Sequence, residues 1–175
     1  MTNVPGRVLR TQRIINSSGT AATLTVNNAA DYTYTALIGS GGTNLGLTKS
    51  GVGKFTLSGA NTYSGGTTVQ AGTVTFSNNT AFGSGTITMA GVATLRNTAD
   101  VTTTNNIVVN AATTLDVTGG NWTLNGNLSG SGNITRGTAA TLSLILGGDN
   151  SAYTGLFTIQ SNANSIVRFA STTSG

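Results

Sequence analysis

Residues 47–73 read LTKSGVGKFTLSGANTYSGGTTVQAGT. Two short runs in it, KFTL at residues 54–57 and TTV at residues 67–69, combine threonine with Phe, Leu or Val. Around them stand Gly-Val-Gly, Ser-Gly and Gly-Gly sequences. Short alternation is typical of a half-buried strand, and clusters of Gly, Asn and Ser are typical of turns. The stretch therefore predicts very short β-strands joined by tight corners.

The same pattern returns later in the chain. Residues 57–69, LSGANTYSGGTTV, are echoed by residues 146–159, LGGDNSAYTGLFTI, and Asn61 matches Asn150 at an offset of 150 − 61 = 89. Three further matches occur in the same order: 22–26 with 113–117, 38–42 with 128–132 and 47–49 with 134–136. Such self-similarity predicts a repeat architecture with a cycle of about 90 residues.

The repeats predict one continuous domain. We expect residues 1–15 to form an N-terminal arm or first strand, and residues 16–175 to form a single solenoid with cycles at roughly 16–105 and 106–175. A β-sandwich is the alternative for a unit of this size, but sandwiches use longer strands with stronger apolar faces. Runs this short favour an all-β solenoid, in which each strand stacks on its equivalent in the next coil.

Strand candidates occur along the whole chain, and no segment has apolar residues at helical spacing. They cover residues 23–26, 32–38, 54–57, 67–76, 86–89, 106–109, 113–117, 122–124, 141–146, 156–159 and 165–169. Their apolar side chains are expected to face the core. These are Leu24, Val26, Phe55, Leu57, Val69, Val74, Phe76, Ile87, Met89, Leu95, Val109, Leu115, Val117, Leu124, Leu142, Leu144, Leu146, Phe157 and Ile159.

The alternating threonines are expected to point outward as ladders of hydroxyls. Thr-x-Thr pairs begin at Thr23, Thr33, Thr73 and Thr86, and flat threonine arrays of this kind raise the hypothesis of ice binding. Ice binding requires equal rungs on one face. The offsets between the pairs are 33 − 23 = 10, 73 − 33 = 40 and 86 − 73 = 13, and this inequality argues against the hypothesis.

Small and turn-forming residues dominate the composition. Gly (25), Thr (34), Asn (19) and Ser (16) account for 94 of 175 residues, and only 7% of the chain is charged. There is no His, Cys or Glu, which excludes a histidine base, a thiol nucleophile and a His- or Cys-ligated metal site. The spacing of the four acids, Asp31, Asp100, Asp116 and Asp149, indicates turn formers rather than paired catalytic carboxylates. We expect a protein that is not an enzyme and has no cofactor or metal.

The stretch from Leu47 to Thr73 resembles the autotransporter-associated β-strand repeat, also known as the passenger-associated transport repeat. The residues that stand in the family order are Gly51, Gly53, Leu57, Gly59, Asn61, Tyr63, Gly65 and Gly66. The second copy retains Asn150 and Tyr153 but has Thr138 and Ala140 in place of the first two glycines. The resemblance implies a right-handed parallel β-helix of the type found in bacterial surface passengers, where the repeat is linked to secretion across the outer membrane.

The motif glycines are interpreted as structural. A phosphate-binding loop needs a helix and a Lys-Ser/Thr pair after its glycines, and neither is indicated. We expect Gly51, Gly53, Gly65 and Gly66 to form corners of the coil, where glycine supplies the positive φ of tight turns.

Tyrosine and asparagine recur at matching places of the two copies. Tyr63 follows Asn61 as Tyr153 follows Asn150, which indicates a lock at the corner rather than a sugar-binding platform. Stacked asparagines would form a hydrogen-bonded ladder. The candidates for this ladder are Asn61, Asn78, Asn105 and Asn150.

The net charge is +4, and Arg7, Arg10 and Arg13 form the one cluster of charge. A spacing of three places successive side chains on alternate faces of a strand, and no aromatic platform for nucleotide bases lies among them. We expect a solvated arm and no nucleic-acid partner. The alternative role of the three arginines is a contact with a neighbouring subunit, with anionic lipid or with a polysaccharide.

No run approaches the roughly 18 apolar residues of a membrane-spanning helix, and residues 1–19 do not read as a signal peptide. A stack of coils ends in unpaired backbone groups. We therefore expect a structural solenoid of the outer cell surface or extracellular matrix that stacks head to tail into filaments. The alternative is an adhesin or glycan-binding module on a secreted passenger, and an enzyme acting on polysaccharide ranks third.

Overall fold

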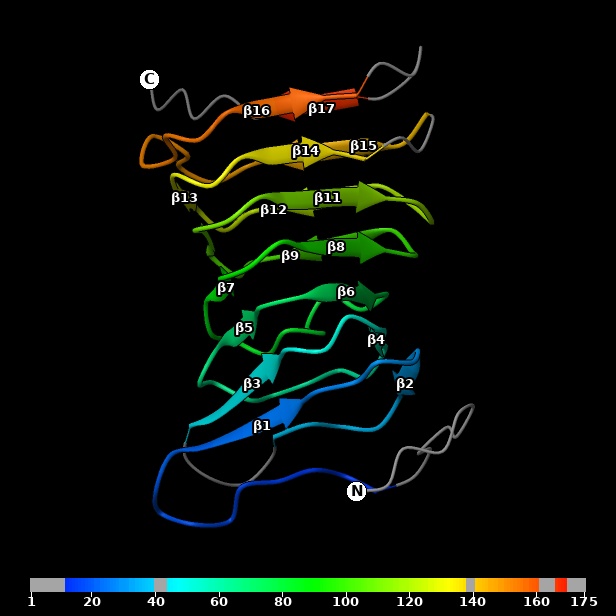
Figure 1. Ribbon diagram of the computed structural model, residues 1–175, viewed down its shortest axis with the longest axis vertical. Coiled ribbons are helices and arrows are strands. Elements are labelled where there is room, and N and C mark those ends of the chain that lie inside the picture. Colours follow the sequence, from blue (N-terminus) through cyan, green and yellow to red (C-terminus); the bar gives the residue numbers. More distant parts are fainter. Residues whose placement is uncertain (1–11, 40–43, 138–140, 161–165, 170–175) are drawn as a thin grey trace.

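Strands of only three to five residues form where β-branched or aromatic residues alternate with small polar ones. The computed structural model describes residues 12–39, 44–137, 141–160 and 166–169. The strands of this part pair in parallel with strands one coil away, so that successive turns of the chain lie on top of one another along the long axis (Figure 1). The protein is an all-β solenoid, as predicted.

Three sheets make up the three faces of the solenoid. The six-stranded sheet contains β1 (Ala22–Val26), β3 (Leu45–Lys49), β5 (Thr67–Val69), β7 (Ile87–Met89), β10 (Ile107–Val109) and β13 (Leu128–Gly130). The seven-stranded sheet contains β2 (Tyr32–Tyr34), β4 (Lys54–Leu57), β6 (Gly72–Phe76), β8 (Ala93–Asn97), β11 (Thr113–Val117), β14 (Ile134–Arg136) and β16 (Phe157–Ile159). The four-stranded sheet contains β9 (Val101–Thr103), β12 (Trp122–Leu124), β15 (Ser143–Leu146) and β17 (Ile166–Phe169).

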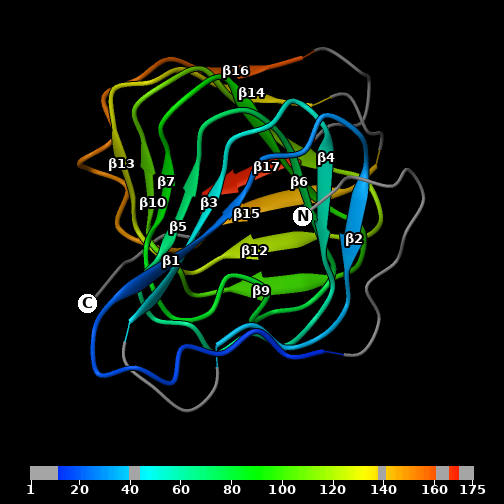
Figure 2. The same ribbon diagram turned by 60° about the horizontal axis from the view of Figure 1, so that its bottom comes forward.

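Each complete coil visits the six-stranded, the seven-stranded and then the four-stranded sheet. Seen from the N-terminal end, the chain runs clockwise as it recedes, so the β-helix is right-handed (Figure 2). In the N-terminal half the third face carries connecting segments instead of strands, namely residues 58–66 between β4 and β5 and residues 77–86 between β6 and β7.

One coil takes 19 to 23 residues. Phe55 pairs with Val74 (74 − 55 = 19), whereas Tyr32 pairs with Phe55 (55 − 32 = 23). The predicted strand over residues 67–76 is wrong in one respect: it is two strands, β5 and β6, because the chain turns a corner at Gln70 and Ala71 and passes to the next sheet. β3, β8, β9, β13 and β14 were not among the predicted strands.

The sequence cycle of about 90 residues is not a whole number of coils. Four steps along the seven-stranded sheet lead from β4 to β14, and β15 follows on the next face. Leu57 in β4 therefore has its counterpart, Leu146, on the four-stranded sheet. Val69 of the six-stranded sheet corresponds in the same way to Ile159 of the seven-stranded sheet. The second copy of the repeat is turned by one face relative to the first.

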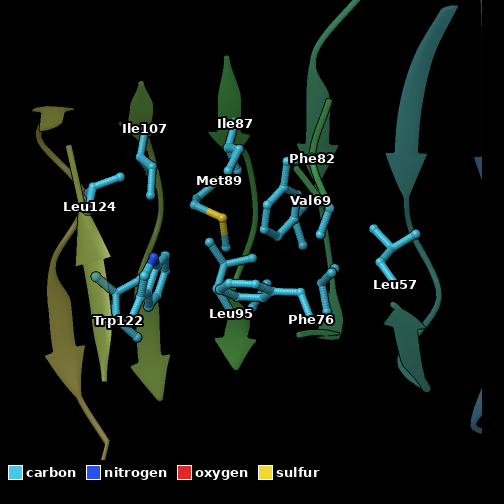
Figure 3. Packing of buried hydrophobic residues seen from close by; sticks show 14 of the residues in the cluster. Leu57, Val69, Phe76, Phe82, Ile87, Met89, Leu95, Ile107, Trp122 and Leu124 are labelled. Atoms are coloured by element: carbon cyan, nitrogen blue, oxygen red, sulfur yellow. The ribbon is translucent and has the colours of Figure 1, made fainter. Parts of the chain in front are cut away.

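The core is a narrow column of side chains inside the coils (Figure 3). Within this column the ring of Phe76 meets the ring of Phe82 edge to face at 4.8 Å and that of Trp122 at 5.0 Å. The indole Nε1 of Trp122 donates a hydrogen bond to Thr103 Oγ1 at 2.9 Å, so that its polar atom is satisfied inside the core.

Most of the side chains predicted to face inward are buried. The prediction is wrong for Ile159, which is 49% exposed, and Leu24, Val26, Leu142 and Phe157 are only partly buried. All five lie in the first or last coils or beside them, where fewer neighbours cover the core. Buried apolar residues absent from the prediction include Tyr34, Ile38, Leu45, Tyr63, Phe82, Ile107, Trp122, Leu128 and Ile134.

Two basic side chains lie inside the solenoid. Lys49 and Arg136 are fully buried, and their cationic groups donate hydrogen bonds to backbone carbonyls at the coil corners. Lys49 Nζ donates to Gly51 O and, at 3.2 Å, to Ala71 O. Burial lowers the pKa of the Lys49 amine because the charged form loses its hydration.

The buried amine makes stability depend on alkaline pH. In the unfolded chain Lys49 keeps its proton up to its ordinary pKa of 10.5, whereas the folded chain releases it at lower pH. Between the two pKa values the unfolded state holds more protons, so stability rises with pH. We expect the free energy of unfolding of the wild type to increase relative to that of Lys49→Met between pH 7 and pH 10.5. Urea denaturation of both proteins measures it, and a difference that does not change with pH contradicts the prediction.

Candidate functional site

Residues 58–66 carry the centre of the first repeat across the third face of the solenoid, between β4 and β5. Asn61 in this segment is buried and joins three consecutive coils. Its Oδ1 accepts the Ile38 N–H of the coil before it at 2.9 Å, and its Nδ2 donates to Ala81 O of the coil after it at 2.6 Å. The amide side chain thus adds to the backbone hydrogen bonds that join these coils on a face without strands, such as that from Thr62 N–H to Ile38 O at 3.0 Å.

Tyr63 occupies the gap between the same coils. Its hydroxyl lies 2.6 Å from Thr67 Oγ1, and burial raises its pKa well above the ordinary value. Glycines lie on both sides. A Cβ on Gly39 in the coil before would come within 2.6 Å of Tyr63 Cβ, and a Cβ on Gly83 in the coil after would come within 2.0 Å of Tyr63 O. Tyr63 therefore fits only because both neighbours lack side chains.

The second copy builds a similar contact on a different face. Asn150 Oδ1 accepts the N–H of Leu128 at 3.0 Å, and Leu128 matches Ile38 at an offset of 128 − 38 = 90. Tyr153 pairs with Gly130 at the end of β13, and its hydroxyl lies 2.9 Å from Gly132 O. This copy lies over the six-stranded sheet, whereas the first lies on the third face. The Asn150 amide Nδ2 stays local and donates to Gly148 O.

A family profile described as passenger-associated-transport-repeat matches residues 47–76 and 140–161, which hold these two asparagine–tyrosine segments. The chain carries two passenger-associated transport repeats. Comparisons with curated proteins and with solved structures give no match. The likeness to this repeat therefore rests on the two matched segments.

The glycines of the first passenger-associated transport repeat serve a purpose different from the predicted one. Only Gly66 has a positive φ, at 81°. The other four face backbone of the preceding coil, where an added Cβ would come within 2.0 to 2.7 Å of a neighbouring atom. They are Gly51, Gly53, Gly59 and Gly65. Close approach of coils, rather than turn conformation, requires glycine at these positions.

The predicted asparagine ladder is wrong in its partners. Asn61, Asn105 and Asn150 bond to backbone groups, and Asn78 accepts from Thr80 in a local turn. Ladders of another kind run up two corners, where each side-chain oxygen accepts a backbone N–H one coil later. One passes from Asp100 through Asn121 to Ser143, and the other passes from Asn106 through Asn127 to Asp149.

The remaining acids are engaged in ion pairs. Asp31 Oδ2 lies 2.9 Å from Lys54 Nζ at the surface, and Asp116 Oδ2 lies 2.7 Å from Arg96 Nε in the next strand of the seven-stranded sheet. Hydrogen bonds from Lys54 lower the pKa of Asp31. In the described part of the chain no three acidic, His or Cys side chains gather where a metal ion could bind.

Threonines form regular outward ladders. On the seven-stranded sheet Thr73, Thr94, Thr114, Thr135 and Thr158 occupy one register position in five consecutive coils. A second ladder on the six-stranded sheet contains Thr25, Thr48, Thr68 and Thr88. The unequal offsets along the sequence were misleading, because the pairs at Thr23 and Thr86 belong to the six-stranded sheet, whereas those at Thr33 and Thr73 belong to the seven-stranded sheet and lie two coils apart. Each ladder is nevertheless mostly one threonine wide, because only some strands carry two outward threonines. Ice binding would need a broader array.

The N-terminal arginines lie largely outside the described residues, which exclude Arg7 and Arg10. Arg13 is exposed, and the next residue, Ile14, pairs with Ile38 on the third face. The chain thus joins the solenoid by Ile14. No helix in the described ranges has the length and apolar character needed to cross a membrane.

Sequence reasoning missed Gly39, Gly83 and Lys49. The repeat alignment gave no signal for the first, because the match of residues 38–42 with residues 128–132 places Ser129 opposite Gly39. No pattern marks Lys49 as a core residue.

Removing the Asn61 side chain tests its role between coils. Asn61→Ala leaves the buried Ile38 N–H and Ala81 carbonyl without this partner, which is expected to cost about 2 kcal/mol or more. The control Asn78→Ala removes only a local, partly exposed turn and should cost less than about 1 kcal/mol. Urea denaturation measures both, and equal losses would show that Asn61 does not join the coils.

Adding one methyl group tests the close approach at the corners. A Cβ on Gly51 would lie 2.0 Å from Asn28 O, so Gly51→Ala should destabilise the fold by about 2 kcal/mol or more. In Gly46→Ala the nearest atom is 3.4 Å away, and the change should stay within about 0.5 kcal/mol. Thermal unfolding compares the two variants. A stable Gly51→Ala protein would contradict the observed spacing of coils.

Proposed function

We propose that the chain is a non-enzymatic structural segment of a secreted, passenger-like surface protein, and that it stacks end to end with a second copy of itself. The repeat family and the right-handed solenoid support a surface passenger. A rigid stack of this kind spaces and displays whatever it carries. The engagement of all four acids in ion pairs or corner hydrogen bonds supports a role without catalysis.

Apolar surface at the two ends of the stack supports end-to-end association. β1 and β2 are the outermost described strands at one end of the stack, and β16 and β17 are the outermost at the other. Around the latter, Leu156, Ile159 and Phe169 are exposed although they are large and apolar. At the opposite end Ile15 is exposed and Leu24 is partly buried. Joining two such ends extends the parallel sheets and covers apolar side chains.

A charge at the exposed edge should prevent stacking. In the double variant Ile159→Lys/Phe169→Lys, two ammonium groups would have to lose water at the junction, and edge lysines block strand pairing. The matched control is Val52→Lys/Val92→Lys, because both valines are exposed on turns between the six- and seven-stranded sheets, away from the stack ends.

Sedimentation velocity and negative-stain microscopy measure the outcome. The wild type and the control are expected to form fibres one solenoid wide at high concentration, whereas the edge variant stays monomeric. A wild type that remains a monodisperse monomer contradicts the stacking proposal, and so do fibres that the edge variant forms equally well.

Binding of a surface or matrix glycan is the second function that we propose. The observation in its favour is the ladder of hydroxyls that the six-stranded sheet presents to solvent over consecutive coils. This function needs only the side face of the stack, and it is therefore independent of end-to-end association.

A further inference from the structure

A polar groove of about 440 Å³ lies on the outer side of the six-stranded sheet, beside β3, β5 and β7. Its lining residues are small and uncharged. They are Asn44, Ser64, Gly65, Gly66, Thr67, Thr68, Ser84, Gly85, Thr86 and Thr88. The groove thus spans consecutive coils and runs along the solenoid beside the threonine ladder.

The groove arises where an outward column of the sheet loses its side chains. Thr23 pairs with Gly46 in the next coil. The same column continues through Gly66 and Thr86 in the two coils after that, because these residues directly precede the paired Thr67 and Ile87. Thr68 and Thr88 of the neighbouring column form one wall. Gly46 and Gly66, which follow one another in this column in consecutive coils, therefore leave a trough, and hydroxyl groups border it along its length.

The opposite wall is held in place by a hydrogen bond between coils. Ser64 Oγ donates to Asn44 Oδ1 at 3.0 Å, and Ser84 lies beyond Ser64 in the next coil. Both walls thus present polar groups whose positions are set by the spacing of coils, about 4.8 Å.

Gly46 is the glycine that the fold does not require. A Cβ there would meet its nearest neighbours at 3.4 Å from Gly65 O and 3.7 Å from Gly66 O, which are ordinary contacts, and its φ is not in the left-handed region. By contrast, Gly65 leaves only 2.7 Å to its nearest neighbour. Glycine weakens a strand interior, so a side chain at position 46 would be compatible with the sheet. Gly46 does not itself line the groove, but a side chain there would lie against Gly65 and Gly66, which do.

The lining selects the chemistry of a ligand. It contains hydroxyls, one amide and backbone groups, and no Lys, Arg or Asp. An anionic or cationic ligand would find no opposite charge, and an apolar ligand would strip water from polar groups without replacing their hydrogen bonds. A neutral molecule with many hydroxyls both donates to and accepts from such a surface.

We infer that this groove binds a neutral oligosaccharide, with the sugar chain lying along the coils between the threonine ladder and the Ser64 wall. The inference deepens the second proposed function by giving it a site and a ligand class. Because the lining offers no aromatic platform, affinity for one chain is expected in the millimolar range, about 4 kcal/mol, and display of many copies on a surface would raise it through avidity.

Amide chemical shifts of the 15N-labelled chain, titrated with cellohexaose, maltohexaose and chitohexaose to about 20 mM, test the inference. We expect at least one of these neutral probes to shift the amides of residues 64–68 and 84–88. Gly46→Thr fills the trough and should weaken that binding by about tenfold or more. The matched control is Gly19→Thr, since Gly19 is exposed with nothing within 4 Å of its Cβ position and lies outside the groove.

Thermal unfolding of both variants shows whether they fold like the wild type. A folded Gly46→Thr protein that loses the shifts, with a Gly19→Thr protein that retains them, supports the site. If Gly46→Thr does not fold, Thr68→Val tests the same wall by removing one hydroxyl, and weaker binding supports the site. Three results overturn the inference: no shifts with any neutral probe, equal binding by a folded Gly46→Thr protein, or shifts only with an acidic hexasaccharide of hyaluronan. None of these results bears on stacking.

Discussion

Parallel hydrogen bonding between successive coils places backbone about 4.8 Å from backbone along the whole solenoid, and most features of the protein depend on this spacing. At the corners there is room for an atom of the peptide unit but often not for a Cβ, as at Gly51 against Asn28 O. Where a corner N–H has no strand partner, an Asn or Asp oxygen from the coil before accepts it, as Asp100 does for Asn121. The abundance of Gly and Asn follows from these two requirements, while threonine fills the outward strand positions that face water.

In this chain the two segments that match the passenger-associated transport repeat join neighbouring coils through buried or partly buried side chains. Asn61 and Tyr63 perform this on the third face, and Asn150 and Tyr153 make corresponding contacts over the six-stranded sheet. Since the sequence cycle equals four coils and one further face, the two copies do not lie above one another. The contact to the coil before is common to both copies, as Asn61 accepts from Ile38 and Asn150 accepts from Leu128, and it works on either face because all coils have the same spacing.

The fold class could be predicted from sequence because short alternating runs and recurrent glycines leave few architectures open. The strands at 113–117 and 122–124 were predicted with their observed bounds, since each has two apolar residues at alternate, inward positions. β3 was not predicted because Gly46 lies within it and the buried Lys49 ends it. β8 was missed for a related reason: its inward Asn97 donates hydrogen bonds to Ala99 O and Gly120 O inside the solenoid, a partnership that no local pattern reveals. The groove likewise depends on which glycines become neighbours across coils, and this is a property of register rather than of sequence.

The second repeat is turned by one face relative to the first. Interstrand backbone nuclear Overhauser effects in the labelled chain test this rotation, because they show which strands are paired with one another. The account predicts that the effects from Ile145 reach Thr123 and Arg168, its register partners in the four-stranded sheet. Effects from Ile145 to Thr114 or Thr135 of the seven-stranded sheet, where Leu57 of the first copy lies, would mean that the repeat spans whole coils and would contradict the account.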